Sequence, residues 1–404
     1  MRILAVETSC DETAIALAEF FGPKKKPDIK VLSNIVSSQI KLHAKFGGVI
    51  PNLAKREHQK NLVLVLLRAL KETKLLESNI KHKVSNKLDT KYKILNTILE
   101  REPELLTQFK KHILPLKPPI IDAIVVTYGP GLAPALWVGV NFAKAIAYLW
   151  NKPLIPINHM AGHIYSSLLQ IQNIKYKILD IKFPALALLV SGGHTELVFM
   201  QGHRKYKIIG ETRDDAVGEA FDKVARILGL GYPGGPKISR LAQKGDPKKY
   251  PLPSPMINSK DYNFSFSGLK TAVLYLVYDV PYLVRYKLYR TKYGTKLPLQ
   301  VKTDIAASFQ KAVVDVLVKK TVRAAKEYRV KTILLGGGVA ANKELRLRLG
   351  EAVRKELLDS KFLIPNSLLT GDNALMIAVA AYFSGKKNIW HKIRADANAR
   401  LDKM

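Results

Sequence analysis

The chain has 404 residues and carries 65 Lys and Arg against 33 Asp and Glu, a formal net charge of +32. With 47% hydrophobic residues it can bury the core of one large or two ordinary domains, which excludes a disordered or a fibrous protein. A charge this large and of one sign suits a polyanionic partner, so nucleic acid is the first candidate and a solvated, lysine-rich surface is the alternative.

Cysteine content and hydropathy point to a cytoplasmic protein. The single cysteine, Cys10, excludes a disulfide scaffold and a cysteine-based zinc cluster. Residues 1–6 are followed directly by the charged residue Glu7, so this stretch lacks the long apolar segment of a signal peptide. The apolar stretches 136–150 and 374–383 are too short, or too interrupted by polar residues, to cross a bilayer. We therefore expect no membrane contact.

Two β-hairpins are predicted, one in each half of the chain. Residues 2–6 and 14–18 are aliphatic runs joined by a polar segment, which predicts a strand, a turn and a second strand. The same order returns at residues 185–190 and 195–200, joined by the turn Ser191-Gly192-Gly193-His194. Glycine lets backbone N–H groups approach a phosphate closely, although glycine turns are more often simple turns.

Each predicted hairpin is followed by a strand, a glycine turn and a helix. The two copies are residues 124–127 with Gly129-Pro130-Gly131 and a helix through Trp150, and residues 333–335 with Gly336-Gly337-Gly338 and a helix after Asn342. A pattern repeated at about half the chain length indicates an internal duplication. We therefore predict two α/β domains around a nucleotide cleft, residues 1–156 and 157–385.

Two basic segments lie outside this repeat. Residues 75–119 interrupt the first domain and contain a predicted helix from Ile94 to Ile113. The proline-rich stretch 115–119 closes this segment, so we interpret it as a peripheral basic insertion, either idle or an added contact surface. The last stretch, 386–404, is predicted to be a loosely held basic tail.

Three residues form a candidate metal site. His159 and His163 are four residues apart behind the helix cap Asn158, which places both imidazoles on one helix face. Asp372, just ahead of an apolar helix, is the candidate third ligand, with a helix cap as the alternative. Two imidazoles and one carboxylate suit iron or zinc with open positions. A zinc protease would carry Glu after the first His, where Met160 stands, so that interpretation lacks its general base.

Residues 214–230 predict an amphipathic helix. Its apolar face holds Val217, Phe221, Val224 and Leu228, and the opposite face holds Asp215, Glu219, Asp222 and Arg226. The apolar face is expected to be core, whereas the acidic face either binds ribose hydroxyls or is solvated. Gly229 is expected to end the helix, and Tyr232 to Pro236 to form a rigid turn.

Eight motifs occur in order along the chain. They are Glu7-Thr8-Ser9-Cys10-Asp11-Glu12-Thr13, residues 159–163, 191–195, 218–223, 232–236, 264–270 and 337–342, and Asp372-Asn373. Together they closely resemble the universal tRNA threonylcarbamoyladenosine transferase family, whose bacterial form is called TsaD. The resemblance runs from residue 1 to about 385 apart from the basic insertion. It implies the actin-like, sugar kinase and Hsp70 ATPase fold.

The resemblance also implies an acyltransferase activity. Such an enzyme takes threonylcarbamoyl-AMP and passes the threonylcarbamoyl group to N6 of the adenosine just 3′ of the anticodon, in tRNAs that read ANN codons, and AMP leaves. His159, His163 and Asp372 would then hold one divalent metal ion, iron or else zinc. The implied adenylate site consists of Leu189, Val190, Ser191, Gly192, Gly193, Asp222, Gly235 and Asn342.

A general base and several partners complete this hypothesis. The exocyclic amine is a poor nucleophile because its lone pair is delocalised into the purine, so Asp11 or Glu12, at the first hairpin turn, is expected to take the amine proton. The tRNA anticodon stem-loop would lie across the basic surface. The resemblance implies a separate threonylcarbamoyl-AMP synthase upstream, a TsaB-like paralogue and a TsaE-like ATPase, and ATP with magnesium is a further candidate ligand.

Two other functions remain open at this point. A small-molecule kinase or ATPase of the same fold is one, because a fold alone does not fix a reaction. A kinase holds Mg²⁺ through carboxylates, however, and has no use for His159 and His163. A non-catalytic, partner-binding paralogue is the other, and it should lack the complete set of metal ligands.

Overall fold

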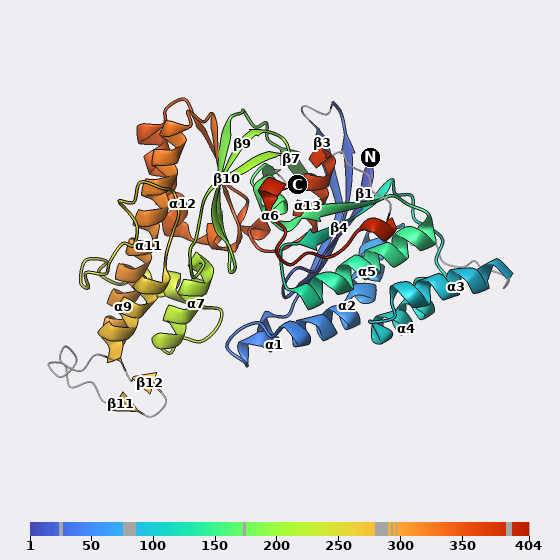
Figure 1. The fold of residues 1–404 in the computed structure, drawn as a ribbon, viewed down its shortest axis with the longest axis horizontal. Helices are drawn as coiled ribbons and strands as arrows, with labels where there is room; N and C mark the ends of the chain where they lie inside the picture. The colour runs from blue at the N-terminus through green and yellow to red at the C-terminus, as the bar shows by residue number, and fades with distance from the viewer. Residues whose placement is uncertain are drawn as a thin grey trace. The chain divides into compact units, whose positions relative to one another are not determined.

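The computed structural model describes residues 1–23, 27–75, 86–172, 175–278, 290–291, 294–295, 297–384 and 390–403. Their contacts divide the chain into two units, which we describe separately (Figure 1). The first contains residues 1–43, 49–180 and 371–404, and the second contains 44–48 and 181–370. The predicted boundaries at 156 and 385 differ from this division. Residues 157–180 and the chain from 371 onward belong to the first unit, because they pair with or cover its sheet.

The first unit is built on a seven-stranded sheet. Its strands are β1 (Arg2–Glu7), β2 (Glu12–Phe21), β3 (Asp28–Ser38), β4 (Ala123–Gly129), β5 (Leu154–Asn158), β6 (Leu169–Gln172) and β7 (Lys175–Ile178). Their order is β5-β4-β1-β2-β3-β7-β6, with β1–β2 and β2–β3 antiparallel and β5, β4 and β1 parallel. The predicted first hairpin and the strand that follows it are therefore present.

Helices cover both faces of this sheet. The helices of this unit are α1 (Ile40–Ala44), α2 (Pro51–Glu72), α3 (Asn86–Ile98), α4 (Pro103–His112), α5 (Ala133–Trp150), α6 (His159–Ser166), α13 (Ala374–Ser384), η4 (Trp390–Lys392) and η5 (Leu401–Lys403). Of these, α2, α5, α6 and α13 pack on its strands. Leu4 and Val6 of β1 share a core with α2 and α5. Ile3 and Ala5 alternate with them and are also fully buried, on the face that α13 covers.

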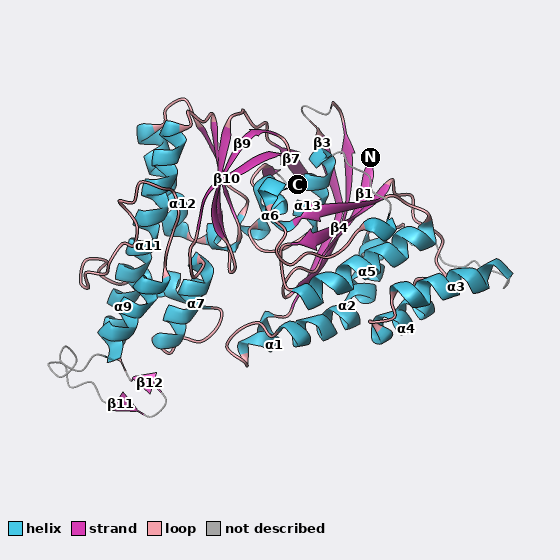
Figure 2. Cartoon of the chain, in the orientation of Figure 1, coloured by secondary structure: helices cyan, strands magenta, loops and turns pink. Residues whose placement is uncertain are grey.

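The second unit repeats the topology of the first. Its strands are β8 (Ala185–Val190), β9 (Thr195–Gly202), β10 (Lys205–Glu211), β13 (Thr332–Gly336) and β14 (Lys361–Leu363), beside a separate two-stranded ribbon, β11 (Arg290–Thr291) and β12 (Gly294–Thr295). The order β10-β9-β8-β13-β14 corresponds strand for strand to β3-β2-β1-β4-β5 (Figure 2). The same hairpin and parallel-strand pattern in both units confirms the predicted α/β duplication.

The helices of the second unit pack on its sheet and on one another. They are α7 (Val217–Ile227), α8 (Gly234–Ala242), α9 (Ser267–Tyr278), α11 (Leu299–Glu327), η2 (Gly338–Ala341), α12 (Lys343–Glu356) and η3 (Ser367–Leu369). The predicted apolar face of α7 is core, and Phe221 meets Phe309 of α11 edge to face, with ring centroids 5.0 Å apart. The turn expected at 232–236 is instead the start of α8, whose Gly234 N–H donates to Asp222.

None of the described helices combines the length and the apolar composition needed to cross a bilayer.

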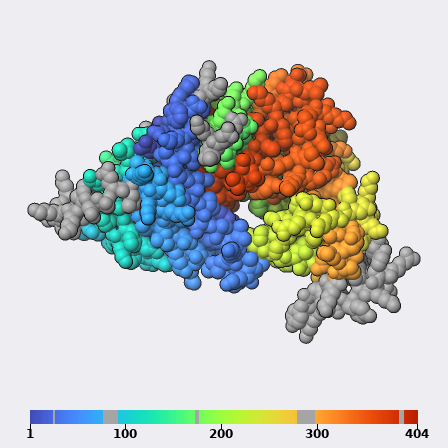
Figure 3. Space-filling model, turned by 180° about the vertical axis from the view of Figure 1, so that it is seen from behind, coloured from blue at the N-terminus to red at the C-terminus, as the bar shows by residue number. Residues whose placement is uncertain are grey.

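The basic insertion differs from its prediction in two respects. The single helix expected from Ile94 to Ile113 is two helices, since Pro103 cannot continue α3 and instead begins α4. The described part is also anchored rather than peripheral, and α4 lies beside α2 (Figure 3). Its fully buried side chains are Leu95, Leu99, Leu105, Phe109 and Ile113. Residues 76–85 of this segment lie outside the described residues.

The tail expected to be loosely held is packed against the first unit over residues 390–403. Ile393 and Leu401 are buried, and Asp396 N–H donates to Tyr128 O over 2.8 Å. Asn158 Nδ2 donates to Ala399 O over 3.2 Å. The prediction was wrong here because composition alone does not show which backbone groups a basic segment can satisfy.

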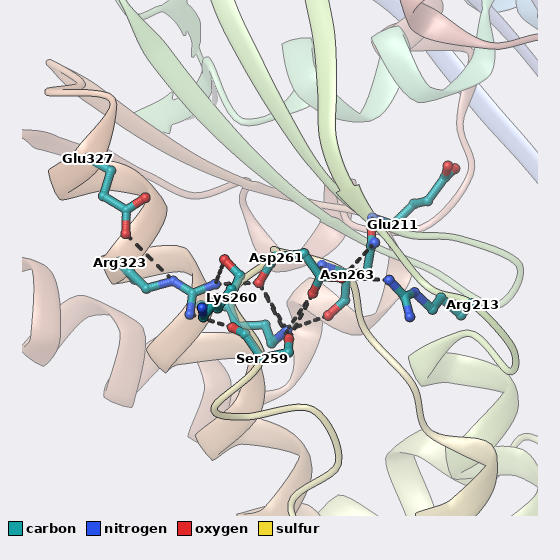
Figure 4. A network of polar contacts seen from close by, with 9 residues as sticks. Glu211, Arg213, Ser259, Lys260, Asp261, Asn263, Arg323 and Glu327 are labelled. Atoms are coloured by element: carbon teal, nitrogen blue, oxygen red, sulfur yellow. Dashed lines mark hydrogen bonds and ion pairs between the residues drawn. The ribbon is translucent and has the colours of Figure 1, made fainter.

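A polar network holds one loop of the second unit (Figure 4). The Lys320 side chain of α11 is fully buried, and its Nζ donates to Ser259 Oγ over 2.7 Å and to the carbonyl of Asn263. Burial lowers the pKa of Lys320, and Asp261, 3.7 Å away, opposes that effect. Arg323 Nη1 donates to Ser259 O over 2.7 Å. These bonds fix the segment that enters the 264–270 motif.

Candidate functional site

His159, His163 and Asp372 come together within the first unit. His163 Nε2 lies 3.2 Å from Asp372 Oδ1, and His159 Nε2 lies 3.5 Å from the same oxygen. One ligand atom from each residue can be chosen so that all three lie within 4.8 Å of one another. Ligand atoms that share an ion at about 2.1 Å lie roughly 3 to 3.5 Å apart, so the two distances to Asp372 Oδ1 fit a common cation.

Local sequence explains why the three side chains meet. Asn158 caps α6 as predicted, since its Oδ1 accepts from Met160 N–H over 2.9 Å. In α13 the side chain that accepts from the first turn is Asn373, which accepts from Met376 N–H over 3.1 Å, while Asp372 faces the histidines. Gly162 allows α6 and α13 to approach, because a Cβ there would lie 2.7 Å from Ile377 Cδ1.

A buried carboxylate orients His159. Glu7 Oε2 lies 3.2 Å from His159 Nδ1, and Thr127 Oγ1 donates to the same carboxylate. Ser9 N–H donates to Glu7 Oε1 over 2.6 Å. Burial alone would raise the pKa of Glu7, but His159 outweighs it and the pKa is lowered. An ionised Glu7 accepts the Nδ1 proton of His159 and leaves the Nε2 lone pair toward Asp372, the arrangement typical of a metal-ligating histidine.

The electrostatics also favour a cation at this place. Burial by itself lowers the pKa of His159, but Asp372 and Glu7 outweigh it and raise the pKa to about 9. Neither ring nitrogen of the fully buried His163 has a hydrogen-bond partner among the described residues, although Nε2 lies close to Asp372. A buried imidazole left in this state is suited to metal coordination. The residues present therefore fit a divalent ion.

Asp11 lies in the first hairpin turn of the same unit, and Glu12 follows it as the first residue of β2. Burial, together with repulsion from Asp372 and Asp11, raises the pKa of Glu12 well above its usual value. Asp11 is buried, and its Oδ2 has no hydrogen-bond partner among the described residues. The turn is thus near enough to the histidine and Asp372 cluster for their charges to interact, and it carries a carboxyl group suited to proton transfer.

The predicted adenylate residues lie in the second unit, at the end of β8, in the turn after it, in α7 and α8, and at the N-cap of α12. Leu189 and Val190 end β8 and are fully buried, so neither residue presents exposed atoms to a ligand. Ser191 N–H donates to His194 O over 2.8 Å, which closes the turn. A Cβ added at Gly192 or Gly193 would meet no heavy atom within 4 Å, so the turn leaves open space beside its backbone.

The other three adenylate candidates, Asp222, Gly235 and Asn342, do not belong to this turn. Asp222 Oδ1 accepts the Gly234 N–H over 2.6 Å, so this oxygen joins α7 to α8. Gly235 again has open space where a Cβ would stand. Asn342 is an N-cap, since its Oδ1 accepts from Leu345 N–H over 3.0 Å, and its Nδ2 donates to Gln310 over 2.7 Å. Asp222 and Asn342 therefore have structural contacts of their own.

Comparison with known proteins decides the assignment. The family model described as TsaD, tRNA N6-adenosine threonylcarbamoyltransferase, matches residues 30–82 and 107–379. A tRNA N6-adenosine threonylcarbamoyltransferase of Thermosipho melanesiensis is 44% identical over 391 residues, which cover 96% of this chain and 97% of that protein. The protein of the same name from Bacillus subtilis is 42% identical over 392 residues, 96% of this chain and 92% of that protein. The chain belongs to the TsaD family.

Membership confirms the predicted family, fold class and enzyme class. The TsaD family is a family of acyltransferases acting on tRNA, and the duplicated α/β topology of the two units agrees with the fold that the resemblance to this family implied. The family implies a divalent metal, which the His159, His163 and Asp372 group could hold. The TsaD model leaves residues 83–106 unmatched, which agrees with a departure from the family pattern inside the predicted insertion.

Sequence reasoning assigned no role to Glu7, Ser9 and Thr127, although Glu7 and Ser9 lie in one of the quoted motifs. The contacts of Glu7 with Thr127 and with His159 each cross more than 100 residues of chain, so no local spacing reveals them. The available signal was a charged residue at the end of an otherwise apolar strand, since such a carboxylate is buried only with partners.

Proposed function

We propose that the protein transfers a threonylcarbamoyl group from threonylcarbamoyl-AMP to N6 of the adenosine 3′ of the anticodon, in tRNAs that read ANN codons. The observation that carries the proposal is the cluster of His159, His163 and Asp372 in a chain of the TsaD family. The cluster supplies a metal site that a kinase of the same fold does not need.

The second unit supplies the groups for the adenylate. The backbone of Ser191, Gly192 and Gly193 offers N–H groups to the phosphate, and their open surroundings support close approach by an anion. Gly235 and Asn342 would border the nucleoside, together with Asp222. Neutralising the phosphate makes AMP a better leaving group, because negative charge develops there as the carbonyl carbon is attacked.

The first unit supplies the groups for the carbonyl. His159, His163 and Asp372 would hold one divalent ion, which acts as a Lewis acid on the carbonyl that is transferred. We propose iron rather than zinc, since two histidines and one carboxylate with open positions form the ligand set typical of non-haem Fe(II). Glu7 keeps His159 in the ligating tautomer.

A carboxylate of the hairpin turn would accept the amine proton. Attack by N6 on the carbonyl carbon forms the new C–N bond, the bond from that carbon to the AMP oxygen breaks, and the proton leaves N6. Glu12 or Asp11 takes this proton as general base. The raised pKa of Glu12 makes its carboxylate a stronger base than that of an ordinary glutamate, which suits a group that accepts the amine proton.

The proposal includes partners. The tRNA would be bound largely through its phosphates by the excess positive charge of the chain. A threonylcarbamoyl-AMP synthase supplies the donor, and a TsaB-like paralogue and a TsaE-like ATPase assist turnover, with ATP and magnesium as a further ligand. The reaction takes place in the cytoplasm, where tRNA is processed.

One experiment tests the function and the metal site together. The purified chain, prepared without oxygen, is given threonylcarbamoyl-AMP and unmodified tRNA, and the modified nucleoside and bound metal are measured by mass spectrometry. Asp372→Asn should lose most bound metal and reduce transfer by at least tenfold, whereas Asp359→Asn, an exposed carboxylate of the second unit, should change neither. Transfer at the wild-type rate by metal-free Asp372→Asn would contradict the proposed role of the cluster.

A further inference from the structure

The described part of the first unit contains a cavity of about 600 Å³ that the proposed reaction does not use. It lies among α2, the α3–α4 segment, the first part of α5 and η4, and none of the candidate metal ligands lines it. Half of its described lining residues lie in 97–102 and 390–391, outside the stretches that the TsaD model matches. Chemistry shared by the family therefore does not account for it.

Two large aromatic side chains line this cavity. Trp137 and Trp390 are two of the three tryptophans in the chain. Trp137 is 37% exposed. Trp390 is held against Tyr148 of α5, with ring centroids 5.5 Å apart, and against the edge of His391 at the same distance. Aromatic rings fixed in this way at an open cavity are surfaces on which a planar base can stack.

The polar lining of the cavity favours an anion. Lys55, Arg101 and Lys144 line it, and burial together with the nearby Arg394 lowers the pKa of Lys144. Glu100 is exposed at its edge.

Glu102, the second acidic lining residue, is withdrawn from the cavity mouth. It is almost fully buried and accepts from Asn141 Nδ2 over 3.2 Å. Burial raises the pKa of Glu102, against the opposing effects of Asn141 and Lys55. The lining as a whole holds three cationic side chains, Lys55, Arg101 and Lys144, against the two carboxyl groups of Glu100 and Glu102. The lining thus combines aromatic faces with an excess of positive charge.

We propose that this cavity binds a single-stranded stretch of RNA, with a base stacked on Trp137 or Trp390 and a neighbouring phosphate paired with Lys55 or Lys144. The inference rests on the proposed function, because it takes tRNA as the substrate. Base faces are accessible only where RNA is unpaired, as in loops and at ends, and aromatic stacking combined with phosphate pairing is the usual way in which proteins bind such segments. The cavity is a second RNA contact, separate from the groups that carry out transfer.

Binding of a fluorescent single-stranded RNA oligonucleotide to the full chain, followed by anisotropy, tests the proposal. Trp137→Ala should weaken binding about tenfold, and Trp137→Phe should restore part of the affinity. Lys55→Gln should weaken binding and reduce the slope of log affinity against log salt by about 1. The matched controls are Tyr275→Ala, which removes an aromatic side chain 62% exposed on α9, and Lys355→Gln, which removes an exposed lysine of α12. Both should bind as the wild type does.

Each outcome bears on the proposal. Wild-type affinity in both Trp137→Ala and Lys55→Gln would overturn it, as would equal losses in the two controls. Weaker binding of free AMP by Trp137→Ala, with binding of the oligonucleotide unchanged, would also overturn it, in favour of a mononucleotide site in the cavity. Lys55→Gln keeps the test valid should Trp137→Ala not fold. The transfer assay separates this proposal from the proposed function. If the wild type does not transfer the group, but the cavity variants lose RNA binding, only the proposed function is wrong. If the wild type transfers the group, but the cavity variants bind RNA as the wild type does, only the cavity proposal is wrong.

Discussion

At the scale of single residues, the first unit holds a charged side chain, that of Glu7, in the buried interior of its sheet. Glu7 is fully buried, and it is tolerated there because His159, Thr127 and Ser9 all contact its carboxylate. This arrangement makes the candidate ligand set dependent on Glu7, which contacts His159 but is not one of the three ligand residues itself. The pair of histidines and Asp372 could be predicted from sequence, whereas the carboxylate behind them required the fold.

The two carboxylates of the hairpin turn are expected to act on turnover rather than on donor affinity. Asp11→Ala and Glu12→Ala, made singly, should lower kcat by at least tenfold and change the donor dissociation constant by less than about twofold, because the proton is transferred only during reaction. Single-turnover kinetics and equilibrium binding of the donor measure the two quantities. Unchanged kcat in both variants would remove the turn from the mechanism.

His58 gives the protein a dependence of stability on pH. Its Nδ1 contacts Thr13 Oγ1 and its Nε2 contacts Cys10 O, and burial lowers its pKa below 6.5. The unfolded chain therefore takes up a proton before the folded protein does, so stability is full above about pH 6.5 and falls at lower pH. The loss is at most about 1.4 kcal/mol per pH unit for this one proton.

Urea denaturation between pH 5 and 8 measures this effect. His58→Asn removes the titrating group, so its stability should fall less steeply below pH 6.5 than that of the wild type, although it is less stable at neutral pH. Identical slopes in the two proteins would show that other groups cause the acid dependence.

At the scale of elements, glycines in the second unit serve two different purposes. Gly337 has φ of +92°, and a Cβ there would lie 2.3 Å from Val190 O, so the turn after β13 needs glycine in order to pack against β8. Gly192 and Gly193 have neither constraint, because a Cβ on either would enter open space. Glycine at these two positions is not explained by folding.

The two kinds of glycine are expected to respond differently to substitution. Gly337→Ala should destabilise the protein by about 2 kcal/mol or more, since both backbone strain and a clash with a carbonyl oxygen result. Gly192→Ala and Gly193→Ala should change stability by no more than about 0.5 kcal/mol and yet weaken binding of the donor. Thermal melting and donor titration separate these effects. Full donor affinity in both of the latter variants would argue against a phosphate at this turn.

Asn342 caps α12 and is also a candidate ligand contact, and two substitutions separate these two roles. Asn342→Asp keeps the oxygen that caps α12 but loses the Nδ2 donor to Gln310, whereas Asn342→Ala loses both. The alanine variant should therefore lose about 1 kcal/mol more stability than Asn342→Asp does. If Asn342 also borders the nucleoside, both variants should weaken donor binding. Normal binding in the alanine variant would leave Asn342 a purely structural residue.

Elements were predicted well where local pattern determines them. Residues 185–190 form the expected strand, and the cap at Asn158 begins the expected helix. The interruption at Pro103 was also present in the sequence, but the periodicity on both sides concealed it. The packing of residues 390–403 could not be predicted, because it depends on a backbone carbonyl of β4 and on the Asn158 side chain of β5, both distant in sequence.

At the scale of the whole molecule, charge and duplication were visible in the sequence and the division into units was not. Hairpins and glycine turns repeat at a fixed spacing, which reveals two copies of one topology. Nothing in the amino-acid composition shows that the chain returns to the first unit at residue 371. A helix as apolar as α13 has the same pattern whichever sheet it covers.

The net charge of +32 leads to a prediction about tRNA binding as a whole. If six or more phosphates are neutralised, affinity should fall roughly 10³-fold between 50 and 200 mM salt, because counterions are released on binding. Anisotropy titrations over that range provide the slope. A slope near zero would mean that the positive charge does not serve RNA binding.

The return of the chain also has a consequence for biosynthesis. His159 and His163 leave the ribosome long before Asp372, and all of residues 181–370 is made in between. The nascent first unit therefore has a sheet with one face still uncovered by α13, and a pair of imidazoles without their carboxylate. A metal ion could therefore be held by all three residues only after translation has passed residue 372.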